Sequence, residues 1–191
     1  MKRKIPKIKI SDSKLTGKRI ILRPLKFSDA KDIYSNIKDK RIAENTIRTP
    51  WPYKLEDAQK FIRKMQRAWK KGKSFAFGIE SRDKKEVIGC IILYDVDFKN
   101  KNTEISYWLG PKYRNQGIMT EGVKLVLNFA FRKLKLHRVW AKVFSDNPVS
   151  QEVLKRVGFK KEGYHRESTW HFGRWRNDVP YALLVEEFFK K

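Results

Sequence analysis

The sequence predicts a mixed α/β domain with a central sheet, antiparallel in its early strands and parallel in its later ones, and about four helices on both faces. Three segments rich in β-favouring residues follow one another over residues 74–109, separated by polar connectors. A helix-spaced apolar pattern and a further strand then alternate over residues 118–143. With 191 residues, the chain has room for one sizeable core and not comfortably for two.

The first elements follow a basic start. Residues 1–17 alternate lysine with isoleucine and contain no cap signal, so we expect a basic tail before a single domain over residues 18–191. The first strand is expected over residues 19–23, where Pro24 closes it. Ser28–Asp29 then caps a helix whose apolar residues recur at helical spacing.

A proline-rich passage separates this helix from the next. Residues 49–53 contain two prolines and two aromatic residues and are expected to form a loop, either a substrate lip or aromatic packing on the core. A second amphipathic helix is expected over residues 55–69, ending before Gly72. Strands over 74–80, 87–94 and 103–109 then predict an antiparallel meander.

The second half of the chain predicts a parallel crossover. A helix after Gly117 precedes a strand over residues 138–143. Asn147–Pro148 suits the start of a short helix that stops at Gly158. Further strands are expected from Phe159 and over residues 179–185.

Composition limits the partners and the chemistry. Lys+Arg of 45 against Asp+Glu of 21 leaves a formal charge of +24, which favours nucleotides, RNA or acidic surfaces. Cys90 is the only cysteine and lies in an apolar run, so we expect an inert core thiol. The three histidines lack metal-ligand spacing, and no metal is expected. No apolar segment reaches membrane-spanning length, which makes the cytoplasm the expected compartment and a membrane partner unexpected.

The turn over residues 113–121 is a candidate anion site. It joins an aromatic strand to a long amphipathic helix and contains Arg114 and Gly117. Helix starts expose unpaired N–H groups and the positive end of the helix dipole, and a glycine lets a ligand approach the backbone. An ordinary strand-to-helix loop with an incidental glycine explains this stretch equally well.

Several motifs that occur in a fixed order along the chain are more specific than this turn alone. From residue 19 onward the chain resembles the GCN5-related N-acetyltransferases (GNAT), and within them the branch that acetylates the N-terminal alanine or serine of ribosomal proteins. The resemblance rests on Glu104-Ile-Ser-Tyr-Trp-Leu109, Arg114-Asn-Gln-Gly-Ile-Met-Thr-Glu121, Leu136-His-Arg-Val139, Asn147-Pro-Val-Ser150 through Gly158-Phe159, Glu162-Gly-Tyr164 and Gly173-Arg-Trp-Arg-Asn-Asp178.

This resemblance implies acetyl-coenzyme A as co-substrate and no metal. The family's pyrophosphate loop would be read here as Arg114-x-x-Gly117-x-Met119, with methionine where a small residue is usual. Arg114 would supply charge, while the backbone N–H groups hold phosphate oxygens. The residues implied in this loop are Asn115, Gln116, Gly117, Ile118, Met119 and Thr120. Neither a P-loop nor a dinucleotide fingerprint fits, because their further glycines or lysine are absent.

The resemblance also implies direct transfer, in which a neutral amine attacks the thioester carbonyl. Glu104 is the expected base, directly or through water; its other interpretation is a strand-edge charge. Backbone N–H groups of Tyr107, Trp108 and Leu109 are expected to stabilise the oxyanion. Ser150 is the expected acid toward the leaving sulfur, and Asn147 the partner of the pantetheine amide. Both are also explained by helix capping.

The acceptor is the least constrained part. Tyr164, Glu167 and Trp175 are expected to shape the acceptor pocket, or else to form an aromatic cluster on the last strands. A protein N-terminus is the leading acceptor, because an α-amine loses its proton more readily than a lysine. The alternatives are a small amine such as a polyamine or an antibiotic, and a non-catalytic basic module on RNA or ribosomes. The basic surface suggests ribosome association, and a monomer and a homodimer both fit the sequence.

Overall fold

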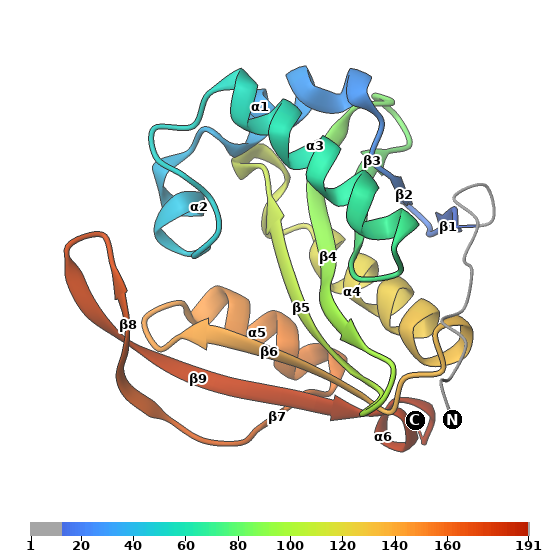
Figure 1. The fold of residues 1–191 in the computed structure, drawn as a ribbon, viewed down its shortest axis with the longest axis vertical. Helices are drawn as coiled ribbons and strands as arrows, with labels where there is room; N and C mark the ends of the chain where they lie inside the picture. The colour runs from blue at the N-terminus through green and yellow to red at the C-terminus, as the bar shows by residue number, and fades with distance from the viewer. Residues whose placement is uncertain (1–12, 191) are drawn as a thin grey trace.

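A single twisted sheet organises the chain in the computed structural model, which describes residues 13–190 (Figure 1). Its strands run in the order β1-β2-β3-β4-β5-β6-β9-β7, and β8 pairs with β9. Their bounds are Leu15–Thr16 (β1), Ile20–Pro24 (β2), Phe75–Ser81 (β3), Val87–Asp97 (β4), Asn102–Leu109 (β5), Arg138–Phe144 (β6), Lys160–Lys161 (β7), His165–His171 (β8) and Arg174–Leu184 (β9).

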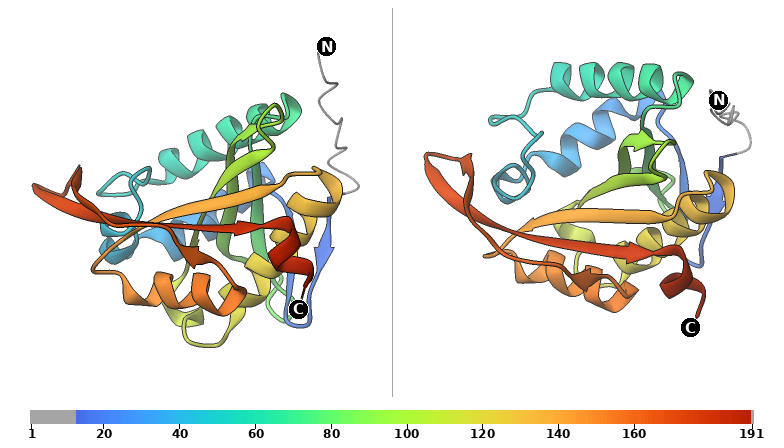
Figure 2. Two further views of the ribbon diagram at one scale, coloured as in Figure 1. Left: turned by 90° about the horizontal axis from the view of Figure 1, so that it is seen from below. Right: turned by 60° about the horizontal axis from the view of Figure 1, so that its bottom comes forward.

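Helices cover both faces of this sheet, as expected (Figure 2). α1, α2 and α3 lie on one face, and α4 and α5 pack together on the other. The bounds are Ala30–Ile37 (α1), Lys40–Glu44 (α2), Leu55–Lys70 (α3), Ile118–Asn128 (α4), Pro148–Val157 (α5) and Val185–Phe189 (α6), with 3-10 turns over Phe27–Asp29 (η2) and Pro111–Tyr113 (η3) and a π-helical turn over Phe129–Lys133 (η4). Among the described residues there are thus six α-helices where about four were expected.

The mixed sheet is confirmed, but its parallel part is smaller than predicted. β1 to β5 form the expected antiparallel meander. Among the described strands, only β5 and β6 run parallel, whereas β9 pairs antiparallel with β6, β7 and β8. Parallel pairing does occur in the later part of the sheet, at β5 and β6, and the sheet returns to antiparallel pairing between β6 and β9. A tight turn at Phe172–Gly173 reverses the chain, so β9 returns as the second arm of a hairpin.

Several boundaries also differ from the sequence-based expectations. Residues 1–12 of the predicted tail lie outside the described residues, while Leu15–Thr16 already pair with β2. The short helix α2 was missed because five residues carry almost no periodicity. β9 begins at Arg174, five residues earlier than expected, because its first five residues include one aromatic among polar and charged side chains and form no apolar run.

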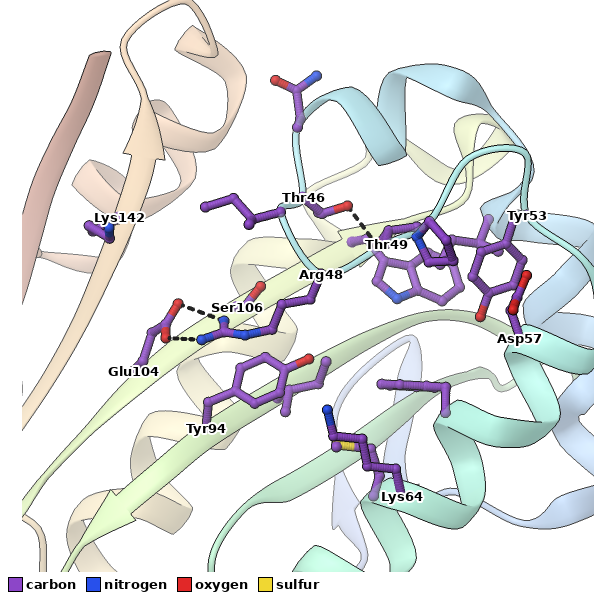
Figure 3. Close-up of a pocket in the computed structure, with 18 of the residues that line it drawn as sticks. Thr46, Arg48, Thr49, Tyr53, Asp57, Lys64, Tyr94, Glu104, Ser106 and Lys142 are labelled. Atoms are coloured by element: carbon purple, nitrogen blue, oxygen red, sulfur yellow. Dashed lines mark hydrogen bonds and ion pairs between the residues drawn. The ribbon is translucent and has the colours of Figure 1, made fainter. Parts of the chain in front are cut away.

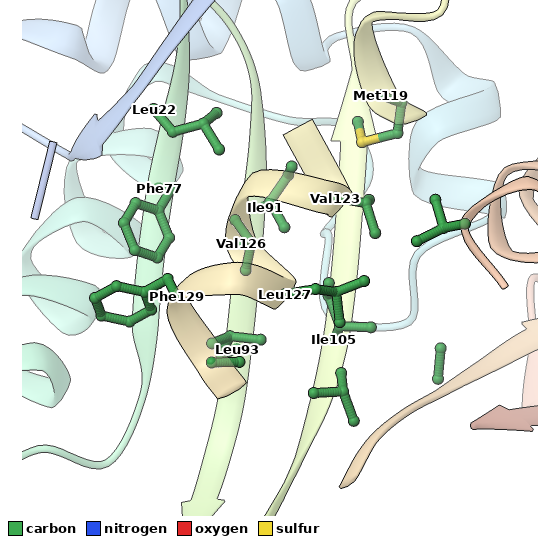
Figure 4. Close-up of a cluster of buried hydrophobic side chains, with 14 of the residues drawn as sticks. Leu22, Phe77, Ile91, Leu93, Ile105, Met119, Val123, Val126, Leu127 and Phe129 are labelled. Carbon is green, nitrogen blue, oxygen red and sulfur yellow. The ribbon is translucent and has the colours of Figure 1, made fainter. Parts of the chain in front are cut away.

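The core lies in two layers, one on each face of the sheet. α4 packs its buried residues against β2 to β5 (Figure 4). This approach is close at Gly122, because an added Cβ would lie 2.7 Å from Ile91 Cδ1. Cys90 is fully buried in the other layer, under α1 and α3, and burial raises the pKa of its thiol.

Residues 13–190 lack two features that would have pointed to other functions. No helix there is both long and apolar enough to span a bilayer. In the same part of the chain, no three His, Cys, Asp or Glu side chains are grouped so that they could hold a metal ion.

Candidate active site

The candidate site lies where β5 and β6 stop pairing. Their parallel pairing ends with Glu104 opposite Trp140, whereas β5 stays paired with β4 as far as Leu109. The strands diverge beyond that point (Figure 1). Every second residue over 105–109 therefore directs its backbone N–H and C=O groups toward β6, where none of the described strands pairs with them. The expected donors at residues 107–109 lie in this stretch.

Side chains of β5 alternate between the two faces at this opening. Glu104, Ser106 and Trp108 line a cavity on the face covered by α1 to α3. Tyr107 points to the opposite face, where its hydroxyl reaches α5. The opening thus connects two differently built half-sites.

Glu104 forms a two-bond ion pair at the floor of the cavity. Arg48 Nη1 and Nη2 donate to its two carboxylate oxygens at 3.0 and 2.9 Å (Figure 3). The Arg48 guanidinium also lies over the Tyr94 ring, 4.2 Å from its centroid. Bonding to Glu104 raises the pKa of Arg48, and burial raises that of Tyr94. The carboxylate that we expected to act as base therefore has a fixed position beside the opening.

The cavity has a volume of about 260 Å³ and contains charges of both signs. Residues 45–50 of the loop between α2 and α3 form one wall, and α3 forms another. This loop includes part of the stretch that we expected to be either a substrate lip or core packing; Thr49 and Pro50 line the cavity, and a role toward substrate stays a prediction. Tyr53 is buried beneath the cavity, whereas Trp51 is exposed.

The remaining wall comes from β6 and β9. Lys142 lies 3.5 Å from the carboxylate of Asp178, which also accepts hydrogen bonds from the hydroxyls of Ser168 and Thr169. The β8–β9 hairpin contacts the end of α2, where His171 Nε2 lies 2.9 Å from the carbonyl oxygen of Ala43. These contacts attach the hairpin to the helices that cover the cavity.

The opposite half-site is built around Ser150. Tyr107 Oη lies 3.0 Å from Ser150 Oγ and 3.1 Å from its carbonyl oxygen. Asn147 is the N-cap of α5, and its side chain accepts a hydrogen bond from the Ser150 N–H at 3.2 Å. The capping interpretation of Asn147 is thus correct, and it fixes the serine beside the opening. Burial raises the pKa of the Tyr107 phenol, so this hydroxyl keeps its proton.

The turn before α4 has the backbone of an anion cradle. Asn115 and Gly117 both adopt left-handed conformations, with φ of +60° and +71°. The first intrahelical bond is donated by Glu121 to the Gly117 carbonyl, which leaves the preceding N–H groups of α4 without helical acceptors. Arg19 lies against this turn, where it donates to the Gln116 carbonyl oxygen and pairs with Glu121 at 3.2 Å.

Arg114 lies beside an acidic residue, whereas Ile118 and Met119 of the same turn are buried. Arg114 Nη2 lies 3.7 Å from Asp39, and burial lowers the pKa of this arginine. Ile118 and Met119 are buried in the core beneath α4. Met119 can replace a small residue because its side chain points into the core and only its N–H faces the cradle side of the helix.

The three predicted acceptor residues lie outside the cavity lining. Tyr164 is exposed before β8, and Trp175 is exposed and packs edge-to-face on Trp170, with centroids 5.3 Å apart. Glu167 has φ of +46°, and its N–H donates to Asn177 Oδ1 at 2.7 Å. Their role toward an acceptor stays a prediction.

Sequence reasoning missed four residues that the fold brings to the site. Arg19 lies 102 positions from its partner Glu121, and Arg48 lies 56 positions from Glu104. No local pattern signals pairs so distant. Lys142 and Asp178 were also missed, since each occurs within a strand that is explained by its apolar residues alone.

Comparison with known proteins places this geometry in a family. The sequence model of the acetyltransferase (GNAT) domain matches residues 19–160. The probable N-acetyltransferase YjcK of Bacillus subtilis is 34% identical over 174 residues, which cover 89% of this chain and 96% of that protein. The ribosomal protein uS5 alanine N-acetyltransferase of Escherichia coli is 31% identical over 120 residues, 62% of each chain. RimJ of Mycobacterium smegmatis, solved with a coenzyme A disulfide, superposes with a TM-score of 0.84 at 23% identity, over 93% of this chain and 90% of that one.

Proposed function

The chain belongs to the acetyltransferase (GNAT) family, and we propose that it moves the acetyl group of acetyl-coenzyme A to the N-terminal α-amine of a protein. One observation carries this proposal. Glu104 and Ser150 flank the same opening between β5 and β6 from opposite faces of the sheet. An amine entering from one side and a thioester entering from the other would meet there.

The residues of the cradle fit the coenzyme. Its pyrophosphate would be held by the free N–H groups at the start of α4, beside the cation of Arg19. The glycine at position 117 leaves the outer side of this turn open, because among residues 13–190 only Arg19 Nη2 lies within 4 Å of where a Cβ would stand. Bound there, acetyl-coenzyme A supplies the activated acetyl group as a thioester.

Two side chains of this protein handle protons in the proposed reaction. Glu104 accepts the proton that the acceptor amine must lose, directly or through water. Arg48 positions that carboxylate, and the incoming amine displaces part of this ion pair. Ser150, held by the Asn147 cap and the Tyr107 hydroxyl, donates a hydrogen bond toward the leaving sulfur. The unpaired backbone N–H groups of residues 105–109 would stabilise negative charge on the carbonyl oxygen.

Relatives and elementary chemistry favour a protein N-terminus as acceptor. Two relatives from Escherichia coli are named as acetyltransferases of ribosomal proteins, one acting on an alanine and one on a serine. An α-amine has a reference pKa of about 8, against about 10.4 for lysine, so a single carboxylate can suffice as base. A ribosomal protein as the acceptor, and the ribosome as a partner of the basic surface, are part of this proposal.

Acetyl transfer to a panel of amines tests the proposal. The panel contains peptides that start with alanine or serine, N-terminally blocked peptides with one lysine, spermidine and an aminoglycoside. Mass spectrometry then locates the added acetyl group. We expect it on the α-amine, and we expect Glu104→Gln to lose most of this turnover, whereas Glu56→Gln, on the exposed side of α3, keeps it.

The panel also separates the alternatives. Turnover of spermidine or the aminoglycoside without turnover of the peptides would identify a small-amine acetyltransferase. Absence of transfer to every amine, together with steeply salt-dependent RNA binding, would identify a binding module that keeps only the fold.

A further inference from the structure

The exposed side of α3 carries an unbroken stripe of cations. Five basic side chains recur at helical spacing and are all exposed: Lys60, Arg63, Lys64, Arg67 and Lys71. Residues three and four apart in a helix lie on one side, so the five share a band along the axis. Lys60 and Lys71 are eleven positions apart, which makes the stripe about 16 Å long at 1.5 Å per residue.

These cations are not neutralised by the helix that carries them. α3 has Glu56 and Asp57 in its first turn and no further acidic residue. Within residues 13–190, none of the five basic side chains forms an ion pair within 4.0 Å. A solvated helix face commonly interleaves opposite charges at this spacing, which gains a few tenths of a kcal/mol per pair. On α3, by contrast, the five positive charges have no acidic residue between them.

The stripe is continuous with the acceptor cavity. Lys60 and Lys64 line that cavity, and the same two residues, with Arg63 and Arg67, line an adjoining hollow on the outside of α3. Figure 3 shows Lys64 on α3 at the edge of the cavity, on the same side as Tyr94. A chain leaving the cavity along α3 would pass from one hollow directly into the other.

We propose that this stripe, Lys60 to Lys71, binds an acidic segment that follows the acceptor N-terminus. The inference rests on the proposed function, since it takes the acceptor amine to enter the cavity. An extended peptide advances about 3.3 Å per residue, so five residues span the stripe. The acceptor class is therefore a polypeptide whose first few residues fill the cavity and whose next five or so carry several aspartates or glutamates.

Charge complementarity selects this occupant. The stripe presents five positive charges with no interleaved acid, and the protein as a whole has a formal charge of +24. Single-stranded RNA has the same sign of charge as an acidic peptide, and it is an outcome of the test.

The test compares two alanine-starting peptides of about 12 residues. One has aspartate or glutamate at positions four to eight, and the other has asparagine or glutamine there. We expect kcat/KM to be about tenfold higher for the acidic peptide at low salt, because several exposed ion pairs add a few tenths of a kcal/mol each. This advantage should shrink as KCl rises from about 50 to about 300 mM.

A double variant removes the outer half of the stripe, and a matched variant serves as control. Arg67→Gln with Lys71→Gln should reduce the acidic-to-neutral ratio to about threefold. Lys124→Gln with Lys133→Gln removes the same charge from α4 and the turn after it, on the other face of the sheet, and should leave the ratio unchanged. Equal loss in both variants, or equal turnover of both peptides by the natural protein, would overturn the inference.

A binding measurement separates this inference from the acceptor assignment. The acidic peptide, N-terminally acetylated and labelled at its far end, is titrated with protein and followed by fluorescence anisotropy. Stripe-dependent binding without any turnover of α-amines would refute the proposed acceptor and support the stripe. The double variant Arg67→Gln with Lys71→Gln is also titrated with a single-stranded RNA of similar length. If it still binds the peptide but no longer binds the RNA, the stripe is not a peptide site.

Discussion

Replacing Gly117 by alanine tests the coenzyme cradle, and the chain offers a matched control. Gly117 and Gly173 have nearly the same left-handed backbone, with φ of +71° and +73°. A Cβ at Gly117 would lie 3.2 Å from Arg19 Nη2, whereas one at Gly173 meets nothing within 4 Å. The two substitutions thus share one backbone cost and differ in what stands beside the new methyl group.

The expected magnitudes follow from these two facts. A non-glycine residue in the left-handed region costs about 1–2 kcal/mol, which lowers Tm by roughly 2–8 °C in a chain of this size. Both variants should show this loss. Coenzyme A at about 100 times its Kd adds about 2.7 kcal/mol to the free energy of unfolding, a rise in Tm of roughly 5–10 °C. A methyl group in the cradle should weaken binding about tenfold, which removes about 1.4 kcal/mol of that gain.

The assay is thermal unfolding with and without coenzyme A, at one ligand concentration for the natural protein and both variants. We expect the ligand-induced rise in Tm to fall to about half in Gly117→Ala and to stay unchanged in Gly173→Ala. Gly117→Glu, which also places a negative charge in the cradle, should abolish it.

The same rise in Gly117→Ala as in Gly173→Ala would refute the cradle as the pyrophosphate site. A lower rise in both would show that the substitutions act through general destabilisation. The destabilisation caused by the left-handed backbone lowers Tm without ligand, and the loss of coenzyme A binding lowers the ligand-induced rise in Tm. One experiment therefore measures the two effects separately.

Other consequences follow from the site and the core. Glu104→Gln should lower kcat/KM for an alanine-starting peptide about 100-fold near pH 7, and the deficit should shrink toward pH 9, where the free α-amine has already lost its proton; a constant deficit would exclude a base role. Ser150→Ala should lower kcat about tenfold, with coenzyme A affinity unchanged, because a thiolate leaves without strong acid assistance; unchanged kcat would leave the serine as a capping neighbour only. Cys90 should resist Ellman's reagent in the folded protein and react after unfolding in urea, since burial raises the pKa of its thiol; fast labelling of native protein would contradict its burial. Bonding to Arg138 lowers the pKa of Glu162 below 4.5 in the folded state, so this stabilisation is present above that value and is lost as pH falls through the folded pKa. Urea unfolding should therefore show a smaller loss of stability on acidification in Arg138→Gln than in the natural protein, and an equal loss would refute it.

Much of the fold could be predicted because local signals and tertiary structure agree. The meander over residues 75–109 was predicted to within three residues at each strand end, since each strand is an apolar run bounded by polar turns. α3 and α5 were predicted for the same reason, from helix-spaced apolar residues and clear breakers. β8 and the first half of β9 were not, because β8 is mostly exposed and Arg174–Asp178 contains no apolar run that would signal a strand after the turn at Phe172–Gly173.

The residues of the site also fall into those that local signals predict and those that only the fold brings together. Residues in contiguous motifs, such as Gly117 and the Asn147–Ser150 turn, could be predicted because helix starts have local rules. The cavity could not, because its walls come from four distant segments that meet only in the folded chain. Arg48 is typical: it lies in an irregular loop, and only the fold brings it to Glu104.

The strict alternation of side chains along β5 limits which insertions and deletions the gene can tolerate. Glu104 faces the cavity and Tyr107 faces α5 only because they are an odd number of positions apart along the strand, namely three. Gain or loss of one residue before Glu104 that shifted the strand by one position would turn the carboxylate away from the cavity and bury it against the core. In the pairing of β4 with β5, the register shifts between Tyr94 and Asp97, next to the pair formed by Tyr94 and Glu104. Length variation in this region can be absorbed by such a bulge, or by the turn at residues 98–101, while the spacing inside β5 stays fixed.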